Sequence, residues 1–431
     1  CKYVILRGFD NITDNENINL LVDDFQKLQY LLNADIVYKQ KYRCKLKTKV
    51  ADKTVFFDLR STGDNYYCEK WEEDIINNRI YDERGFYTPN KSDLLNTLIY
   101  HSIIHKKTVS HKYDELLRKL TFEIYNIRTE DTKNPYNIYN KILSEYMDKN
   151  DYYFIKPADE KVYYNKSEIR KLIWINLLET KYGFKNIEIY NVDKKPSSGF
   201  EFFFTSDYQN KKVFIKCGTG SHYAKKEYNI FKYLCNQNST YFPESIIYRN
   251  LSDNRMFLCI ECIQGETLSD ELINTASIPK LNRMFNSLYE ISEILFKNKF
   301  IHRDINYANL LVEDDGIIKL IDFQHLIGGN FKENIENIEF PQKLSGTNKR
   351  LRPFIFVWDD MYSIYHILKK FDGSKISDYN EKMAVLKSRI GKQRYFFFDN
   401  NFPLKSYFHF RSLIIFKFFN FISKPFRRFT I

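Results

Sequence analysis

The fold is decided by residues 301–312, which read IHRDINYANLLV, and by residues 317–324, which read IIKLIDFQ. In the first segment the tripeptide His-Arg-Asp ends at Asp304, and Asn309 follows five residues later. The second segment is a short apolar run that ends in Asp322 and a phenylalanine. The tripeptide alone is weak evidence, but chance does not account for the gap to asparagine, the apolar strand and the Asp-Phe pair together.

This arrangement resembles the catalytic loop and the metal-binding strand of the protein-kinase-like fold. The resemblance covers roughly residues 186–400 and implies a phosphotransferase that uses ATP and Mg²⁺. Phosphoryl transfer needs a carboxylate beside the attacking hydroxyl group and oxygen ligands that hold Mg²⁺ at the phosphates. The resemblance assigns the first role to Asp304 and the binding of the metal to Asn309 and Asp322.

Three further positions outside this stretch fit the same resemblance. Lys216 ends a strand-like run, VFIK, and is implied to hold the α- and β-phosphates. Glu227 lies on the next predicted helix, where it is placed to pair with Lys216, so both join Asp304 in the implied catalytic set. Asp360 matches an aspartate that braces the catalytic loop, and we expect it to accept backbone N–H bonds from His302 and Arg303.

The implied nucleotide contacts come from two segments. Residues 260–263, IECI, resemble the hinge that binds adenine through backbone groups, here those of Glu261 and Ile263. The glycine-rich loop G-x-G-x-x-G that covers the phosphates in the family is missing. A PSSG segment stands in its place, and its candidate phosphate donors are Ser197, Ser198 and Gly199.

The chain departs from the family at three more positions. Gln324 replaces the flexible glycine that follows Asp-Phe, and Asn306 stands where protein Ser/Thr kinases usually hold lysine. No Ala-Pro-Glu motif follows, and residues 352–354, RPF, are its nearest equivalent. The last two departures affect the handling of a peptide more than the handling of ATP. They favour a sugar or another small molecule as acceptor, as in bacterial sugar and lipopolysaccharide kinases of this fold.

Three interpretations of function stay open. The main one is phosphorylation of a hydroxyl group on a sugar or lipid-linked glycan during surface polysaccharide synthesis. The alternative is a protein Ser/Thr/Tyr kinase, and the third is a pseudokinase module that binds nucleotide without catalysis. The presence of Lys216, Asp304, Asn309 and Asp322 favours an enzyme over a pseudokinase. We expect no nucleic-acid partner, and the oligomeric state stays open.

Strand and helix patterns alternate over residues 1–150, which predicts a small α/β domain. Its motifs resemble the nucleotidyltransferase superfamily, in which a glycine is followed by an Asp-x-Asp pair and a third acid. Here Asn17 and Asn19 replace the pair, and Asp58 keeps the third position. A neutral amide cannot offset the charge of two metal ions. The domain is therefore predicted to be catalytically inactive and to bind a nucleotide, bind the acceptor or act as a scaffold.

The predicted fold class is thus α+β, with the degenerate nucleotidyltransferase-like α/β domain preceding a two-lobed kinase-like domain. We expect the first domain at residues 1–150 and a connector at residues 151–185. The kinase-like domain spans residues 186–400, with a five-stranded lobe that carries one helix followed by a helical lobe. Residues 401–431 form a basic, aromatic tail.

Composition limits the cellular setting. The chain has 431 residues, 43% of them hydrophobic, which excludes a mainly disordered protein. Seven cysteines, an odd number, indicate a reducing compartment, and we expect a cytoplasmic protein. No apolar run reaches the ~18 residues that span a bilayer, and no signal peptide is recognised. Because Cys1 lies inside a strand pattern, we expect some N-terminal sequence to be missing.

Two weak metal motifs have simpler explanations. Cys259 and Cys262 have no second cysteine pair to complete a zinc site, so small buried thiols are the favoured interpretation. His101 and His105 are four residues apart on a predicted helix, where no nearby acid completes a ligand set. We interpret both as ordinary histidines of one helix face.

The tail contributes +6 to the formal net charge of +11, because it holds six basic residues and no acid. On a helical wheel Lys417 and Lys424 share a polar face, and Phe, Ile and Leu lie opposite. This pattern is typical of an interfacial helix, which would bind an anionic membrane surface through residues 405–428 and place the protein peripherally on the inner face of the membrane. A helix packed on the kinase-like lobe explains the pattern equally well. Nucleic-acid binding is the weakest explanation.

If the tail is interfacial, the protein should sediment with anionic liposomes, less with neutral ones and less still at high salt. Each basic residue near an anionic surface contributes about 1 kcal/mol, which salt screens. The double variant Phe418→Glu, Phe419→Glu should stay in the supernatant and keep its ATP binding. A fall in melting temperature without any liposome binding would instead show that the tail packs on the protein.

Overall fold

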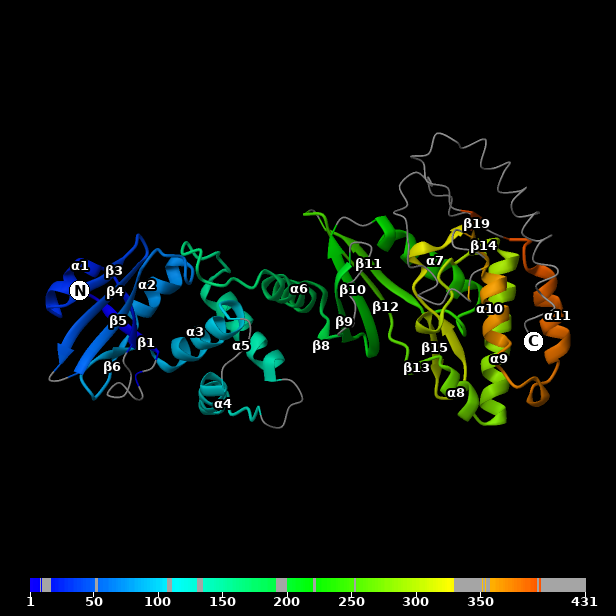
Figure 1. The fold of residues 1–431 in the computed structure, drawn as a ribbon, viewed down its shortest axis with the longest axis horizontal. Helices are drawn as coiled ribbons and strands as arrows, with labels where there is room; N and C mark the ends of the chain where they lie inside the picture. Colours follow the sequence, from blue (N-terminus) through cyan, green and yellow to red (C-terminus); the bar gives the residue numbers. More distant parts are fainter. Residues whose placement is uncertain are drawn as a thin grey trace, which may run out of the picture. The chain divides into compact units, whose positions relative to one another are not determined.

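The chain forms two compact units, of which the first is Cys1–Phe184 and the second begins at Lys185 (Figure 1). The computed structural model describes residues 1–7, 9, 17–50, 53–106, 111–129, 135–190, 200–219, 222–251, 253–328, 351, 353, 357–393 and 395–396. The tail at 401–431 and its proposed helix lie outside the described residues. No helix among the described residues is long and apolar enough to cross a membrane.

The first unit is built on a mixed five-stranded sheet in the order β1-β2-β5-β4-β3. Strands β2 and β5 are parallel and place Asn19 opposite Asp58, and the other neighbours are antiparallel. The strands are β1 (Tyr3–Arg7), β2 (Asn17–Val22), β3 (Asp35–Lys39), β4 (Arg43–Val50) and β5 (Lys53–Ser61). The sequence patterns predicted β1, β2 and β5, whereas they missed β3 and β4. Strand β4 alternates basic with uncharged residues, and β3 has three uncharged residues between Asp35 and Lys39.

Six helices and a small hairpin complete the described part of this unit. They are α1 (Phe25–Leu31), α2 (Glu69–Asn77), β6 (Ile80–Tyr81), β7 (Tyr87–Thr88), α3 (Lys91–Ile104), α4 (His111–Tyr125), α5 (Pro135–Asn150) and α6 (Lys166–Tyr182). Helix α3 begins where the Asn90 side chain accepts a bond from the backbone N–H of Asp93, and every residue from Asp93 to Ile104 is buried. This helix is therefore the centre of the unit.

Residues expected as a connector belong instead to the core of the first unit. Ile169 and Leu172 of α6 are buried in it, and the ring of Tyr152 stacks on Trp71 with centroids 5.1 Å apart. Helix α6 ends at Gly183, whose left-handed backbone favours glycine. The apolar face of α6 needs a partner, and the helices α3 and α5 supply it.

The second unit has the predicted five-stranded antiparallel sheet with one helix, followed by a mainly helical part. The sheet order is β11-β12-β10-β9-β8. Its members are β8 (Lys185–Ile189), β9 (Phe200–Tyr208), β10 (Lys211–Thr219), β11 (Ser245–Asn250) and β12 (Arg255–Glu261), and α7 (His222–Gln237) packs on β11 and β12. Strand β12 contains the fully buried Cys259, whereas Cys262 lies beyond its end and is half-buried.

The helical part is arranged around α9 (Ile278–Lys297), which Ser277 caps and which buries one apolar face. Its other helices are α8 (Asp270–Thr275), α10 (Asp360–Leu368) and α11 (Tyr379–Arg389). Three small sheets are formed by β13 (Gly265–Thr267), β15 (Leu310–Glu313) and β16 (Ile318–Leu320), by β14 (Phe300–Ile301) and β17 (Ile327–Gly328), and by β18 (Val357–Trp358) and β19 (Tyr395–Phe396). Strands β14 to β16 carry the segment that decided the sequence prediction.

Candidate active site

Asp304 lies in the loop between β14 and the 3-10 helix η1 (Tyr307–Asn309), held by two asparagine side chains. The Asn309 amide nitrogen donates to the Asp304 carbonyl oxygen at 2.8 Å and to its Oδ2 at 3.0 Å. The Asn306 amide nitrogen donates to Oδ1 of the same carboxylate at 3.0 Å. The loop therefore turns Asn309 back toward Asp304. Both amides fix the direction of the carboxylate.

A buried carboxylate holds the backbone of this loop through two hydrogen bonds. Asp360, at the start of α10, accepts the backbone N–H of His302 at 2.5 Å and that of Arg303 at 3.2 Å, which confirms its predicted role. Burial raises the pKa of Asp360 to about 7, although the two backbone donors act against this rise. Arg303 has a left-handed backbone (φ 70°), which only a well-supported loop sustains.

Lys216, Glu227 and Asp322 meet between the sheet and the helical part. The Lys216 ammonium lies 2.8 Å from Glu227 Oε1 and 3.2 Å from Asp322 Oδ1. Burial acts to lower the pKa of Lys216, but the two carboxylates outweigh it and hold the pKa above its ordinary value. For Asp322, burial acts to raise the pKa, yet the Lys216 ammonium keeps it below its ordinary value. Burial raises the pKa of Glu227, although the Lys216 ammonium acts against this rise.

Residues 210–338 match the family model of the protein kinase domain. The second unit has a protein-kinase-like fold. A probable serine/threonine-protein kinase mkcF from Dictyostelium discoideum is 32% identical over 123 residues, which are 26% of this chain and 16% of that protein. A probable serine/threonine-protein kinase KIN1 homolog from Encephalitozoon cuniculi is 30% identical over 74 residues, which are 17% of this chain and 13% of that protein. The chain therefore spans a small part of the length of these relatives, and the matches support a kinase phosphotransferase.

A cluster of edge-to-face aromatic rings anchors the segment that carries Asp322 in the kinase-like domain. The ring of Phe323 lies 4.8 Å from that of His302, 5.0 Å from Phe231 and 5.9 Å from Phe242, measured between centroids. The backbone N–H of Phe323 also donates to Glu227 Oε1 at 3.2 Å. Sequence reasoning missed Phe231 and Phe242, since among so many phenylalanines nothing marked these two.

Gln324 has a role that the sequence comparison did not indicate. Its side-chain amide donates to Asp322 Oδ2 at 3.3 Å, and the residue is buried. Asp322 itself adopts a left-handed backbone (φ 67°). The residue that replaces the family's flexible glycine thus adds a hydrogen bond that holds the carboxylate in place.

The predicted nucleotide contacts are only partly described. Glu261 ends β12, where its backbone N–H donates to the Glu244 carbonyl and its carboxylate pairs with Lys319 at 2.9 Å. Its neighbour Ile263 lies in the half-buried segment between β12 and β13. The remaining predicted contacts, Ser197, Ser198 and Gly199, lie outside the described residues.

The donor set fits a magnesium ion. The Asp322 side chain keeps about a quarter of its surface exposed (26%) while one neighbour neutralises part of its charge. The amide oxygen of Asn309 takes part in neither of the bonds that its nitrogen makes to Asp304. A carboxylate and an amide oxygen suit a hard cation that retains several waters.

Asp322→Asn should weaken the binding of Mg²⁺-ATP at least tenfold, because it removes the charged metal ligand and the partner of Lys216. A fluorescence titration with ATP at fixed Mg²⁺ measures this change. The matched control is Asp315→Asn, because Asp315 lies in the turn between β15 and β16, where its carboxylate accepts the Ile317 N–H. Equal affinities for the wild type and Asp322→Asn would remove Asp322 from the metal site.

Proposed function

We propose that the chain is an ATP-dependent kinase that transfers a phosphoryl group to a hydroxyl acceptor. The observation that carries this proposal is the coexistence of the Lys216–Glu227–Asp322 cluster with the oriented Asp304 carboxylate. A pseudokinase has no need to keep Asp304 aligned by two asparagine amides. The presence of both the Lys216–Glu227–Asp322 cluster and the oriented Asp304 carboxylate therefore favours catalysis over nucleotide binding alone.

In this mechanism Asp304 accepts the proton of the attacking hydroxyl group, and its fixed direction places the acceptor in line. Lys216, oriented by Glu227, binds the nucleotide phosphates. Asn309 and Asp322 would hold Mg²⁺, which when bound neutralises the charge that develops on the phosphates. His302 positions the loop: its Nδ1 accepts the Asp304 N–H, so Nε2 carries the proton donated to the Ile321 carbonyl.

The acceptor is the finer part of the proposal. The two relatives reported above are described as probable serine/threonine-protein kinases, which favours a protein hydroxyl group. Asn306 favours a sugar or glycan acceptor instead, because its side chain is engaged with Asp304 and presents no cation to a peptide. We rank the protein acceptor first and the glycan acceptor second.

For the first unit we propose a degenerate nucleotidyltransferase-like domain. Asn19 and Asp58 lie opposite each other on parallel strands, as the resemblance requires of a paired and a third position. Asp58 is held by Arg43 at 3.2 Å, so the one retained carboxylate already has a cationic partner. A domain of this kind has no charge left for two metal ions.

Asp304→Asn should abolish phosphoryl transfer and leave Mg²⁺-ATP affinity within about twofold, because Asp304 faces the acceptor. Transfer is measured with labelled ATP and two acceptor panels, a Ser/Thr/Tyr peptide library and a set of hexoses and lipid-linked glycans. The panel that becomes labelled by the wild type identifies the acceptor class.

Two results would count against this proposal. Loss of nucleotide binding in a folded Asp304→Asn protein would refute the assigned role. Thermal stabilisation by ATP that is the same with and without Mg²⁺, together with no labelling of either panel, would favour the pseudokinase interpretation.

A further inference from the structure

The first unit contains a polar cavity of about 490 Å³, which lies between the sheet and the helix α3. Its lining combines side chains from four strands with His101 and His105 of the α3 end and with the segment that precedes α6. A cavity of this volume is of the size that holds a small organic ligand. None of the candidate catalytic residues of the second unit lines this cavity.

The lining of the cavity is strongly cationic. The lining contains one carboxylate, that of Asp58, and five basic side chains, which are Arg7, Arg43, Arg60, Lys106 and Lys161. Arg43 is paired with Asp58, and Arg60 is paired with Asp64 at 3.0 Å and Asp159 at 3.9 Å. Among the described residues no acid pairs with Arg7, Lys106 or Lys161, so a surplus of positive charge faces the cavity.

Arg7 is the key group, because its guanidinium is buried and incompletely bonded. The residue is 9% exposed, and one nitrogen donates to the Tyr66 hydroxyl at 3.4 Å. Its Nε and Nη1 have no hydrogen-bond partner among the described residues. Guanidinium stays charged in proteins, and a buried charge without a partner is costly. Such a group is retained where a ligand supplies the missing acceptors.

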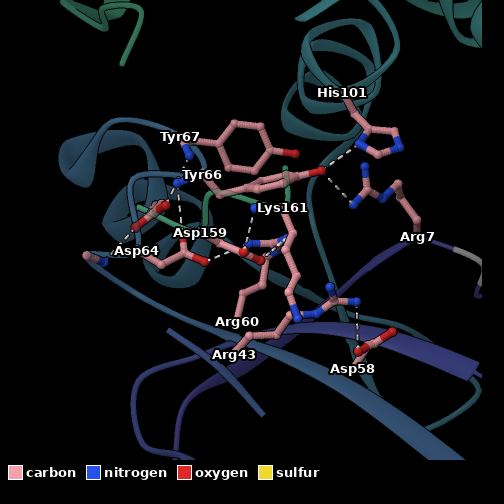
Figure 2. A network of polar contacts seen from close by, with 12 residues as sticks. Arg7, Arg43, Asp58, Arg60, Asp64, Tyr66, Tyr67, His101, Asp159 and Lys161 are labelled. Carbon is pink, nitrogen blue, oxygen red and sulfur yellow. Dashed lines mark hydrogen bonds and ion pairs between the residues drawn. The ribbon is translucent and has the colours of Figure 1, made fainter. Parts of the chain in front are cut away.

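The Tyr66 hydroxyl contacts both Arg7 and His101 at the cavity (Figure 2). The Tyr66 hydroxyl lies 2.6 Å from His101 Nδ1, and Arg60 stacks over the Tyr66 ring at 3.9 Å. His105 is 3% exposed, and neither of its ring nitrogens has a partner among the described residues. Burial, followed by the charge of Arg7, lowers the pKa of both histidines, so they are neutral hydrogen-bonding groups.

We propose that this cavity binds the phosphate group of a small phosphorylated molecule without a metal ion. Arg7 donates to the phosphate oxygens through guanidinium hydrogens that no described residue accepts, and the contact is charge-assisted. Lys161 and Lys106 supply further positive charge, and His105 supplies a neutral donor. Asp58 is already paired with Arg43 and is not available as a metal ligand. The basic side chains of the site would therefore balance the phosphate charge that a metal ion would otherwise neutralise.

The test is isothermal titration calorimetry on the full chain in EDTA. The probes are inorganic pyrophosphate, glucose 1-phosphate and CTP, which share a phosphate group and differ in the rest of the molecule. At least one probe should bind, and the tightest one identifies the source of the phosphate as a phosphate chain, a sugar phosphate or a nucleotide. Binding should persist without Mg²⁺.

Arg7→Gln should weaken that binding at least tenfold. Its control is Arg118→Gln, the same change on α4 outside the cavity lining, which should alter binding less than twofold. Lys216→Met locates the probe, since it should leave this binding unchanged while it impairs ATP binding in the kinase-like domain. The melting temperature of ligand-free Arg7→Gln should equal or exceed that of the wild type, because a buried unpaired charge is removed.

If Arg7→Gln does not fold, Lys161→Gln decides the question, because Lys161 is exposed and its replacement should still weaken binding severalfold. The proposal is overturned if no probe binds to the wild type, or if the folded cavity variants bind as tightly as the wild type. Loss of binding in Lys216→Met alone would place the probe in the kinase-like domain and also overturn it.

Discussion

One oxygen atom, Oε1 of Glu227, joins the parts on which the kinase-like domain depends. It accepts bonds from the Lys216 ammonium on β10 and from the Phe323 N–H after β16, while Glu227 itself belongs to α7. Breaking a buried pair of this kind by removing one partner typically costs about 3–5 kcal/mol, because the other charge is left uncompensated. The sheet, the helix α7 and the segment that carries Asp322 are therefore held together by one oxygen atom.

The sequence predicted those parts of this site that lie close together in the chain or follow a fixed order of elements. Asp304 and Asn309 are five residues apart, so a single loop brings them together. The pairing of Lys216 with Glu227 follows from a strand and the next helix. Asp360 was predicted through its place after the loop, and the reason for its burial is visible only in the fold, where it satisfies two N–H groups that no strand or helix pairs.

The parts that sequence reasoning missed depend on contacts between distant segments. Phe231 and Phe242 pack edge-to-face against Phe323, yet these are three of 37 phenylalanines and carry no local signal. The role of Gln324 could not be predicted, because its departure from the family pattern shows only that a flexible glycine is lost. The hydrogen bond that Gln324 makes to Asp322 is visible only in the fold. His101 and His105 were interpreted as ordinary histidines of a helix face. They are instead buried beside Arg7 and Tyr66, because α3 is enclosed on all sides.

The two units show opposite ways of handling buried charge. In the kinase-like domain the buried Lys216 ammonium is paired with two carboxylates of the same site, those of Glu227 and Asp322. In the first unit the balance is incomplete, because Asn19 brings no charge where the proposed ancestry would place an acid. Asp58 alone remains, and Arg43 neutralises it. Arg7 lines the cavity, and two of its buried nitrogens have no hydrogen-bond partner among the described residues. Under the proposed ancestry, the replacement of two carboxylates by Asn17 and Asn19 would change the site from one that attracts cations to one that attracts anions. The guanidinium groups keep their charge whatever the ligand.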